Sequence, residues 1–374
     1  MHLTILAVAL IGIFVAYTNG ANDVSKGIAT LAGSGVSSYR RAILWGAFWT
    51  TCGSIAAFGF SRALVATFGK GLLAAGVTPM LPAAVATLMG AGVWVGLATR
   101  LGLPVSTTHA IVGSIAGVMS IAYGPAGMNW RVLAGKVALP LLLSPFASLV
   151  LTTVVLRFWK RISASRNDCL CVGVVNQRPA MAGAEMAILP SMPAVEVVTC
   201  NAVEAANSSP HPFSLTFDHL HWLTSAATSF ARGLNDAPKM VALVLAAAAL
   251  SGFSSQPSLL AYLLIAIGIL AGSLQAGRRV TTLLAQRITP MDHREGFSAN
   301  LVTSLLVGSG AAAGLPMSTT HVAAGAIIGI GVQKDGAVDW RRVREMVLAW
   351  VVTLPAAALF GVLSYELLRM GRIM

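Results

Sequence analysis

The stretch GANDVSK at residues 20–26 returns as GLNDAPK at residues 233–239, and this repetition decides the fold. A second stretch, LPVSTTHAIVG at 103–113, returns as LPMSTTHVAAG at 315–325. The spacing is 213 residues between Asp23 and Asp236 and 212 residues between His109 and His321. Because two motifs recur in the same order at a nearly constant offset, we predict that the chain contains two copies of one structural unit.

The composition around these motifs indicates a membrane protein. Hydrophobic residues make up 56% of the 374 residues and charged residues only 10%, whereas a soluble domain carries roughly 25% charged residues. Apolar runs occur at about 3–18, 42–67, 81–99, 109–123 and 131–156, and again at about 222–250, 259–276, 298–313, 322–332 and 346–368. A spanning helix needs about 20 apolar residues, and several runs are shorter. We therefore predict an all-α integral membrane protein with about 10–12 membrane elements, some of them broken or re-entrant.

A polar stretch at about 160–218 separates the two series of apolar runs. It is rich in acidic residues and proline, so it predicts a connecting loop outside the lipid, with two short strands near 169–175 and 194–200. Cys169 and Cys171 fit alternate positions of a strand better than a metal site with Cys200. The predicted organisation is a first transmembrane repeat at 1–159, a polar connecting loop at 160–218 and a second transmembrane repeat at 219–374.

The net charge of +12 comes mostly from basic residues at the ends of apolar runs. This placement is typical of contacts with lipid headgroups and of topology signals, and no nucleic-acid partner is expected. Arg157, Lys160, Arg161 and Arg166 crowd the start of the loop, which predicts that the loop is cytoplasmic. The first apolar run has no basic residue before it, so the N-terminus is expected on the outer side.

The repeated Asn-Asp pairs place carboxylates at positions where hydropathy predicts membrane. A charged side chain costs on the order of 2.5–3.5 kcal/mol there on insertion scales, and it indicates a functional pathway unless it caps a helix. Gly20, Gly233 and Pro238 are expected to break the helices beside these aspartates. Freed carbonyls, an aspartate and an amide would then coordinate a small hard cation such as Na⁺, or carry a proton.

The L-P-x-S-T-T-H motifs predict helices that begin near Ser106 and Ser318, directly after a proline. Hydroxyl groups at a helix N-terminus bind tetrahedral oxyanions. A Ser/His hydrolase is the alternative, but no G-x-S-x-G elbow accompanies the motifs, and no enzyme activity is expected. His109 and His321 are expected to cap or form hydrogen bonds within their own halves. Lys26 and Lys239 would contact an anion, pair with the aspartates or reach the membrane surface; the sequence leaves these alternatives open.

At these residues the chain resembles the PiT family of inorganic phosphate transporters, of the bacterial type. The resemblance rests on GANDVSKG and GLNDAPK, on GLPVSTTHAIVGS and GLPMSTTHVAAGAIIG, and on VLAWVVTLPAAALFGVL near the C-terminus. It covers nearly the whole chain except the loop at about 160–218. Arg232 departs from the small residue or histidine that the resemblance leads us to expect before the second glycine.

The resemblance implies a secondary active transporter that imports inorganic phosphate by symport with Na⁺ or H⁺. Alternating access would take place around a central site where two inverted repeats meet. The implied phosphate-binding residues are Ser106, Thr107, Thr108, Ser318, Thr319 and Thr320; the implied cation-binding residues are Asn22, Asp23, Asn235 and Asp236; Lys26, Lys239, His109 and His321 are accessory candidates.

No cofactor other than the coupling ion is implied, and no metal other than Na⁺. The expected location is the bacterial inner membrane, in contact with the lipid bilayer, and a homodimer is left open. The alternative functions are a permease for sulfate or another tetrahedral oxyanion, and a passive anion channel.

Overall fold

The computed structural model describes residues 2–162, 169–176, 193–200, 213–254, 256–334 and 337–371. The elements of the first half are α1 (His2–Gly33), α2 (Tyr39–Phe60), α3 (Arg62–Ala66), η1 (Thr67–Gly71), α4 (Leu81–Arg100), α5 (Thr107–Tyr123), η2 (Pro125–Gly127), α6 (Trp130–Val132), η3 (Leu133–Ala138) and α7 (Leu139–Ile162). Those of the second half are α9 (Phe217–Leu250), α10 (Leu259–Ala276), α11 (Arg278–Gln286), α12 (His293–Ala312), α13 (Thr319–Val332) and α14 (Trp340–Met370).

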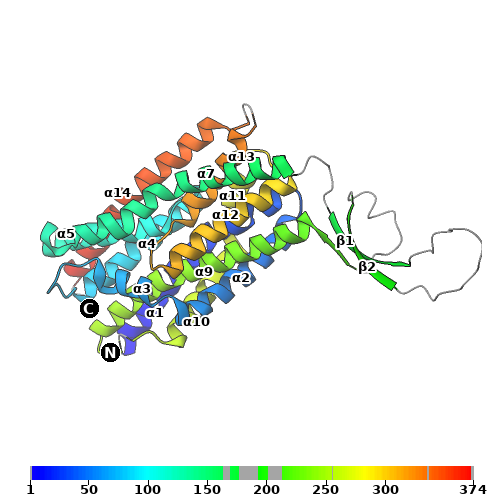
Figure 1. The fold of residues 1–374 in the computed structure, drawn as a ribbon. Helices are drawn as coiled ribbons and strands as arrows, with labels where there is room; N and C mark the ends of the chain where they lie inside the picture. Colours follow the sequence, from blue (N-terminus) through cyan, green and yellow to red (C-terminus); the bar gives the residue numbers. More distant parts are fainter. Residues whose placement is uncertain are drawn as a thin grey trace, which may run out of the picture.

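A small antiparallel sheet follows the first half in the sequence and lies at one end of the helices (Figure 1). Its strands are β1 (Cys169–Asn176), β2 (Pro193–Cys200) and β3 (Phe213–Thr216), in the order β2-β1-β3. The sequence predicted β1 and β2 but missed β3, which leads directly into α9. The side chains of Cys169, Cys171 and Cys200 lie outside the described part of the structure, so the metal-site alternative is not addressed there.

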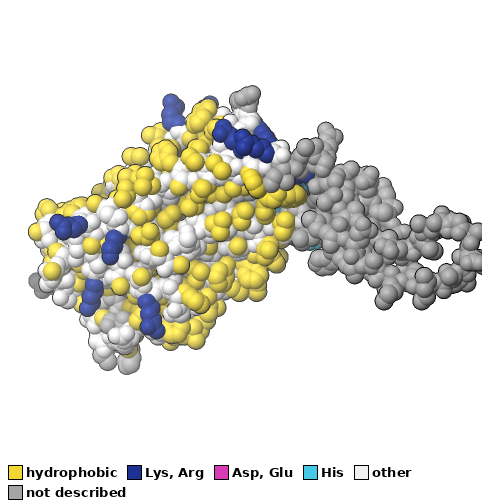
Figure 2. Space-filling model, in the orientation of Figure 1, with side chains coloured by type: hydrophobic (Ala, Val, Ile, Leu, Met, Phe, Trp, Pro, Cys, Tyr) yellow, Lys and Arg dark blue, Asp and Glu magenta, His cyan; other side chains and the backbone are white. Residues whose placement is uncertain are grey.

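The helices form one bundle with an apolar surface, and the chain is an integral membrane protein. Figure 2 shows hydrophobic atoms over the middle of the bundle and Lys and Arg side chains toward its two ends. In the described part of the chain, seven helices are long and apolar enough to span a membrane: Leu3–Gly33, Tyr39–Phe60, Leu81–Arg100, Trp130–Arg161, Phe217–Leu250, Leu259–Ala276 and Trp340–Met370. Helices α5 and α13 are apolar but have only 17 and 14 residues, less than a full span.

The two halves pack against each other reciprocally. Helix α1 packs on α10 while its counterpart α9 packs on α2, and α5 packs on α14 while its counterpart α13 packs on α7. Helix α1 begins at the end of the bundle that holds the chain termini, whereas α9 begins at the end beside the sheet (Figure 1). Equivalent helices therefore run in opposite directions, which is the arrangement of inverted-topology repeats.

Glycines allow the closest of these reciprocal crossings. At four glycines, an added Cβ atom would overlap a backbone carbonyl oxygen of the helix opposite. The glycines and the opposing carbonyls are Gly20 with Ile269, Gly272 with Tyr17, Gly233 with Thr50, and Gly53 with Phe230. Because small residues let backbones approach closely, these glycines fix the α1–α10 and α9–α2 contacts.

The prediction that Gly20, Gly233 and Pro238 break their helices is wrong. Helix α1 is continuous over 32 residues and α9 over 34 residues, with Pro238 in its interior. The two glycines serve helix approach instead. Proline cannot donate to the carbonyl of Leu234 one turn earlier, and the Ser61 hydroxyl donates to that carbonyl at 3.0 Å. The freed acceptor is thereby satisfied, so the helix needs no break.

Basic residues are distributed unequally between the two ends of the bundle. At the sheet end are Arg40, Arg41, Arg100, Arg157, Lys160, Arg161, Arg278, Arg279, Arg287, Arg294, Lys334, Arg341, Arg342 and Arg344, and at the opposite end are Arg62, Lys70, Arg131, Lys136 and Arg369. Cytoplasmic segments of membrane proteins carry the excess of Lys and Arg. We therefore expect the sheet end to face the cytoplasm.

This orientation is testable with two single-cysteine variants in a background whose four native cysteines are replaced by serine. Ser38→Cys places a thiol at the sheet end, and Ala75→Cys places one in the exposed loop at the opposite end. A membrane-impermeant maleimide should label the Ala75→Cys protein in intact cells, and the Ser38→Cys protein only after permeabilisation. Labelling in the reverse order would refute the assignment.

Candidate functional site

Residues from all four motif copies meet inside the bundle. Asn22 and Asp23 lie on α1, Asn235 and Asp236 lie on α9, and the S-T-T-H residues begin α5 and α13. Every site residue predicted from the sequence is buried, with at most 8% of its surface exposed. Polar groups at this depth need partners within the protein.

The two asparagine amides hold the chain segments that lead into the short helices. The Asn22 amide nitrogen donates to the Leu103 carbonyl at 2.9 Å, and the Asn22 side-chain oxygen accepts from the Val105 N–H at 3.2 Å. The Asn235 amide makes both bonds with Met317, at 2.9 and 3.2 Å. Each Asn-Asp motif therefore positions the S-T-T-H motif of its own half.

The two aspartates form buried ion pairs with the lysines that follow them. Lys26 Nζ lies 2.6 Å from Asp23 Oδ1, and Lys239 Nζ lies 3.1 Å from Asp236 Oδ1. Both lysines are 1% exposed, so the alternative that they reach the membrane surface is wrong. The aspartates lie inside long helices and not at their first turns, so the helix-capping alternative is also wrong.

Each ammonium group has three oxygen acceptors, which is its full capacity. Besides its aspartate, Lys26 donates to the Asn22 carbonyl at 2.8 Å and to the Asn22 side-chain oxygen at 2.7 Å. Lys239 donates to the Thr108 hydroxyl at 2.7 Å and to the Met317 carbonyl at 3.3 Å. The second lysine thus joins an aspartate of one half to a hydroxyl of the other.

Asn19 joins the two aspartates and was missed by the sequence analysis. Its amide nitrogen lies 3.1 Å from Asp23 Oδ2, 3.3 Å from Asp236 Oδ2 and 3.1 Å from Thr107 Oγ1. The Thr107 hydroxyl in turn donates to Asp23 Oδ2 at 3.1 Å. One signal was available, because Asn19 precedes Asp23 by four residues and so shares its helix face.

The S-T-T-H serines cap their helices. Ser106 Oγ accepts from the His109 N–H at 3.3 Å, and Ser318 Oγ accepts from the His321 N–H at 3.2 Å. Helices α5 and α13 therefore begin where the sequence predicted, each with its N-terminus at the site.

The threonines connect the two helix N-termini across the halves. Thr320 donates to the Val105 carbonyl at 2.8 Å, and Thr108 lies 3.5 Å from the Met317 carbonyl. Thr319 begins α13 and is buried beside them. Since each bond runs from one half to the other, the site is also a contact between the halves.

The two motif histidines are neighbours, with ring centroids 4.7 Å apart. His321 Nδ1 lies 3.0 Å from the Leu141 carbonyl of the first half, and the His321 ring packs on Trp350 with centroids 4.0 Å apart. The expectation of hydrogen bonds within each half is therefore wrong for His321, while His109 Nδ1 has no hydrogen-bond partner among the described residues. The prediction failed because the sequence could not show that the two short helices face each other.

Arg232 lies one turn before Asp236 on α9 and is 1% exposed. At the offset of 213 residues it is the counterpart of Asn19. Together with the two lysines it gives the site three basic groups against two carboxylates. The fixed charge of the buried site is therefore positive.

These groups suit an oxyanion and a small hard cation. Helix N-termini and hydroxyls bind phosphate-like anions, while carboxylate, amide and hydroxyl oxygens bind Na⁺ or carry protons. Within the described residues there is no cluster of three or more His, Cys, Asp or Glu side chains suited to a metal ion. The arrangement offers no transition-metal site there.

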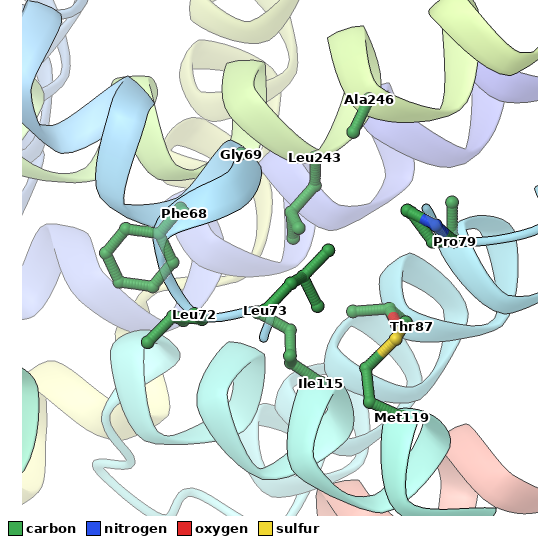
Figure 3. A pocket seen from close by; sticks show the side chains of 11 residues that line it. Phe68, Gly69, Leu72, Leu73, Pro79, Thr87, Ile115, Met119, Leu243 and Ala246 are labelled. Carbon is green, nitrogen blue, oxygen red and sulfur yellow. The ribbon is translucent and has the colours of Figure 1, made fainter. Parts of the chain in front are cut away.

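An apolar pocket lies apart from these charged groups. Figure 3 shows it between η1, α4, α5 and α9, with Phe68, Leu72, Ile115, Met119 and Leu243 among its lining residues. Thr87 adds a hydroxyl, which donates to the Ala83 carbonyl of its own helix. No motif residue and no charged side chain lines this pocket.

Comparisons with known proteins find relatives over nearly the whole chain. A protein from Thermococcus kodakarensis named "Putative phosphate permease" is 26% identical over 399 residues, covering 97% of each chain. A protein of the same name from Haemophilus influenzae is 26% identical over 406 residues, covering 96% of each chain. A solved structure, "The sodium-dependent phosphate transporter", matches all of both chains with a TM-score of 0.80 at 22% identity, and so shares the fold.

The model of one protein family also matches this sequence. The match runs from residue 19 to residue 361 and includes both Asn-Asp and both S-T-T-H motifs. The chain therefore belongs to the phosphate transporter family.

Proposed function

We propose that the chain imports inorganic phosphate together with a cation, Na⁺ or H⁺, by alternating access around the buried site. The observation that carries the proposal is the convergence of all four motif copies where the halves meet, with every proposed phosphate- and cation-binding residue buried. Members of the family are transporters, so this chain is a transporter and not an enzyme. A substrate site shared by two halves is what alternating access requires.

The phosphate site is assigned to the N-termini of α5 and α13. The helix dipoles and free N–H groups there favour an anion, and hydroxyls add donors. The proposed phosphate-binding residues are Ser106, Thr107, Thr108, Ser318, Thr319 and Thr320. The hydroxyls of Thr107, Thr108 and Thr320 bond to protein groups, and those of both serines cap their helices, so phosphate binding would exchange some of those bonds for bonds to the anion.

The cation site is assigned to the Asn-Asp motifs, that is, to Asn22, Asp23, Asn235 and Asp236. Thr107 links this site directly to the phosphate site through its bond to Asp23 Oδ2. The bonds of Lys239 to Thr108 and Asp236 provide a second link. Because Thr107 and Lys239 each join the two sites, occupation of one site would change the affinity of the other for its ligand. This change in affinity is the basis of coupling.

A passive anion channel is the less favoured alternative. A channel for anions has no need of two buried carboxylates, which cost free energy and raise the barrier to an anion. The solved relative is named a sodium-dependent phosphate transporter, which favours cation coupling and Na⁺ as the ion to test first.

We also assign the repeats to residues 1–159 and 219–374, with 160–218 as their connection. In this assignment the repeats move relative to each other about the site, and the network of Asn19, Thr108 and Thr320 is rearranged during the cycle. The bacterial inner membrane is the proposed location.

Reconstituted protein should accumulate ³²P-phosphate in liposomes when an inward Na⁺ or H⁺ gradient is imposed. An ionophore that collapses the gradient should reduce uptake to the level of protein-free liposomes. Uptake that proceeds at the same rate without any gradient would contradict symport and favour a channel.

Asp23→Asn and Asp236→Asn should each abolish gradient-driven uptake. The change keeps the size of the side chain but removes the charge that a cation needs, and it leaves a buried lysine unpaired. Asp218→Asn is the matched control, because Asp218 is about half exposed and pairs with His293 at the sheet end. Normal cation-dependent uptake by both site variants would refute the cation assignment.

Thr107→Val should raise the phosphate concentration for half-maximal uptake by roughly ten- to a hundred-fold. It removes one hydrogen bond to a charged ligand, worth about 1.5–3 kcal/mol, without changing shape. Thr282→Val is the control, since this exposed hydroxyl bonds to its own helix. A shift in cation dependence with unchanged phosphate affinity would reverse the roles assigned to the two motifs.

A further inference from the structure

Arg232 is a buried cation that forms no salt bridge with any described residue. It lies inside α9, is 1% exposed, and its nearest hydrogen-bond partner is Ser273 Oγ, 3.5 Å from Nη2. Nε and Nη1 have no hydrogen-bond partner in the described part of the chain. Buried polar groups are almost always paired, and an unpaired one marks a place for an unseen ligand or ion.

The charge balance of the site leads to the same conclusion. Asp23 pairs with Lys26 and Asp236 pairs with Lys239, so the two carboxylates already have partners. The guanidinium of Arg232 is then the surplus charge. A buried charge without a salt bridge is strongly destabilising, so an anion that enters the site is favoured by pairing with the Arg232 guanidinium.

Arg232 lies on the same face of α9 as the second Asn-Asp motif. It precedes Asn235 by three residues and Asp236 by four, which puts all three on one face of α9. Its guanidinium interacts electrostatically with both Asp23 and Asp236. Arg232 therefore belongs to the same buried cluster as the four motif copies.

Asn19, the counterpart of Arg232 in the first half, has an unpaired acceptor. Two of the contacts of its amide nitrogen are carboxylate oxygens of Asp23 and Asp236, which only accept hydrogen bonds. The orientation of the amide follows, and it leaves the side-chain oxygen Oδ1 buried without a hydrogen-bond partner in the described part of the chain. Among the described residues, Arg232 on α9 thus has donors without a hydrogen-bond partner, and the equivalent Asn19 on α1 has an acceptor without one.

We propose that Arg232 and Asn19 bind the transported oxyanion and read its protonation state. The guanidinium donates to deprotonated oxygens of the anion, and Asn19 Oδ1 accepts from an oxygen that carries a proton. Hydrogen phosphate and dihydrogen phosphate supply both kinds of oxygen, whereas sulfate at neutral pH has no proton to donate. The inference rests on the proposed function, because it names two further residues of the same phosphate site.

The physical basis of the selectivity is the asymmetry of buried hydrogen bonding. A site that has a buried acceptor strongly disfavours a ligand without the matching donor, because the acceptor stays unpaired after binding. Arginine suits the other part of the task, since its guanidinium is always charged and presents planar donors to a tetrahedral anion.

Equilibrium binding of ³²P-phosphate to the purified, detergent-solubilised protein tests the proposal without any ion gradient. Arg232→Gln should weaken binding by at least tenfold. Arg232→Lys, which keeps the charge but not the planar donors, should have an affinity between those of the wild type and Arg232→Gln. Arg279→Gln is the matched control, because this exposed arginine bonds to the Arg100 carbonyl at the sheet end, away from the site. Thermal melting of each variant checks that it is folded.

Competition by sulfate and arsenate tests the role of Asn19. Arsenate, which carries a proton as phosphate does, should displace phosphate from the wild-type protein at far lower concentration than sulfate. Asn19→Leu should reduce this preference by about tenfold, because the acceptor that disfavours sulfate is gone. Equal competition by the two anions in the wild-type protein would contradict the proposal that the site recognises the proton of the anion. This outcome does not depend on whether a variant folds.

The outcomes separate the inference from the function on which it rests. If the wild-type protein binds no phosphate, the proposed function fails. If the wild-type protein binds phosphate and Arg232→Gln binds it equally well, the inference fails and the proposed function stands.

Discussion

Burial of charge inside an apolar bundle is the constraint on which this structure depends. Two carboxylates at membrane depth are tolerated only with partners, and each has a lysine from the next turn of its own helix. Their oxygens also accept from Asn19 of α1, Thr107 of α5 and Asn235 of α9. The ion pairs thus require α1, α5 and α9 to lie together, and the rest of the fold brings them there.

Small residues and reciprocal packing meet this requirement. The crossings of α1 with α10 and of α9 with α2 are close because glycines face backbone carbonyls there. In the middle of each long helix, Asn22 and Asn235 hold the entry into the short helix of their own half, α5 or α13. A network that crosses between halves is the feature that a transporter with alternating access would need to remake in each cycle.

Much of this was predictable from the sequence. The two motif copies predicted two related halves and the starts of α5 and α13, and the composition predicted the membrane class. Local rules failed where tertiary partners override them: a proline interior to α9 is accommodated by Ser61, and glycines that weaken isolated helices serve contacts here. The contact of His321 with Leu141 and the bridge by Asn19 depend on distances between helices, which a single sequence does not contain.

The central claim is that the anion binds where the short helices of the two halves meet. Crystals grown with arsenate, measured at the arsenic absorption edge, would locate the anion directly by anomalous scattering. The account predicts one strong peak at the N-termini of α5 and α13, within contact distance of Thr107 or Thr319 and of Arg232. A peak confined to the apolar pocket near Phe68 or to the basic surface at the sheet end, with none between the short helices, would contradict it.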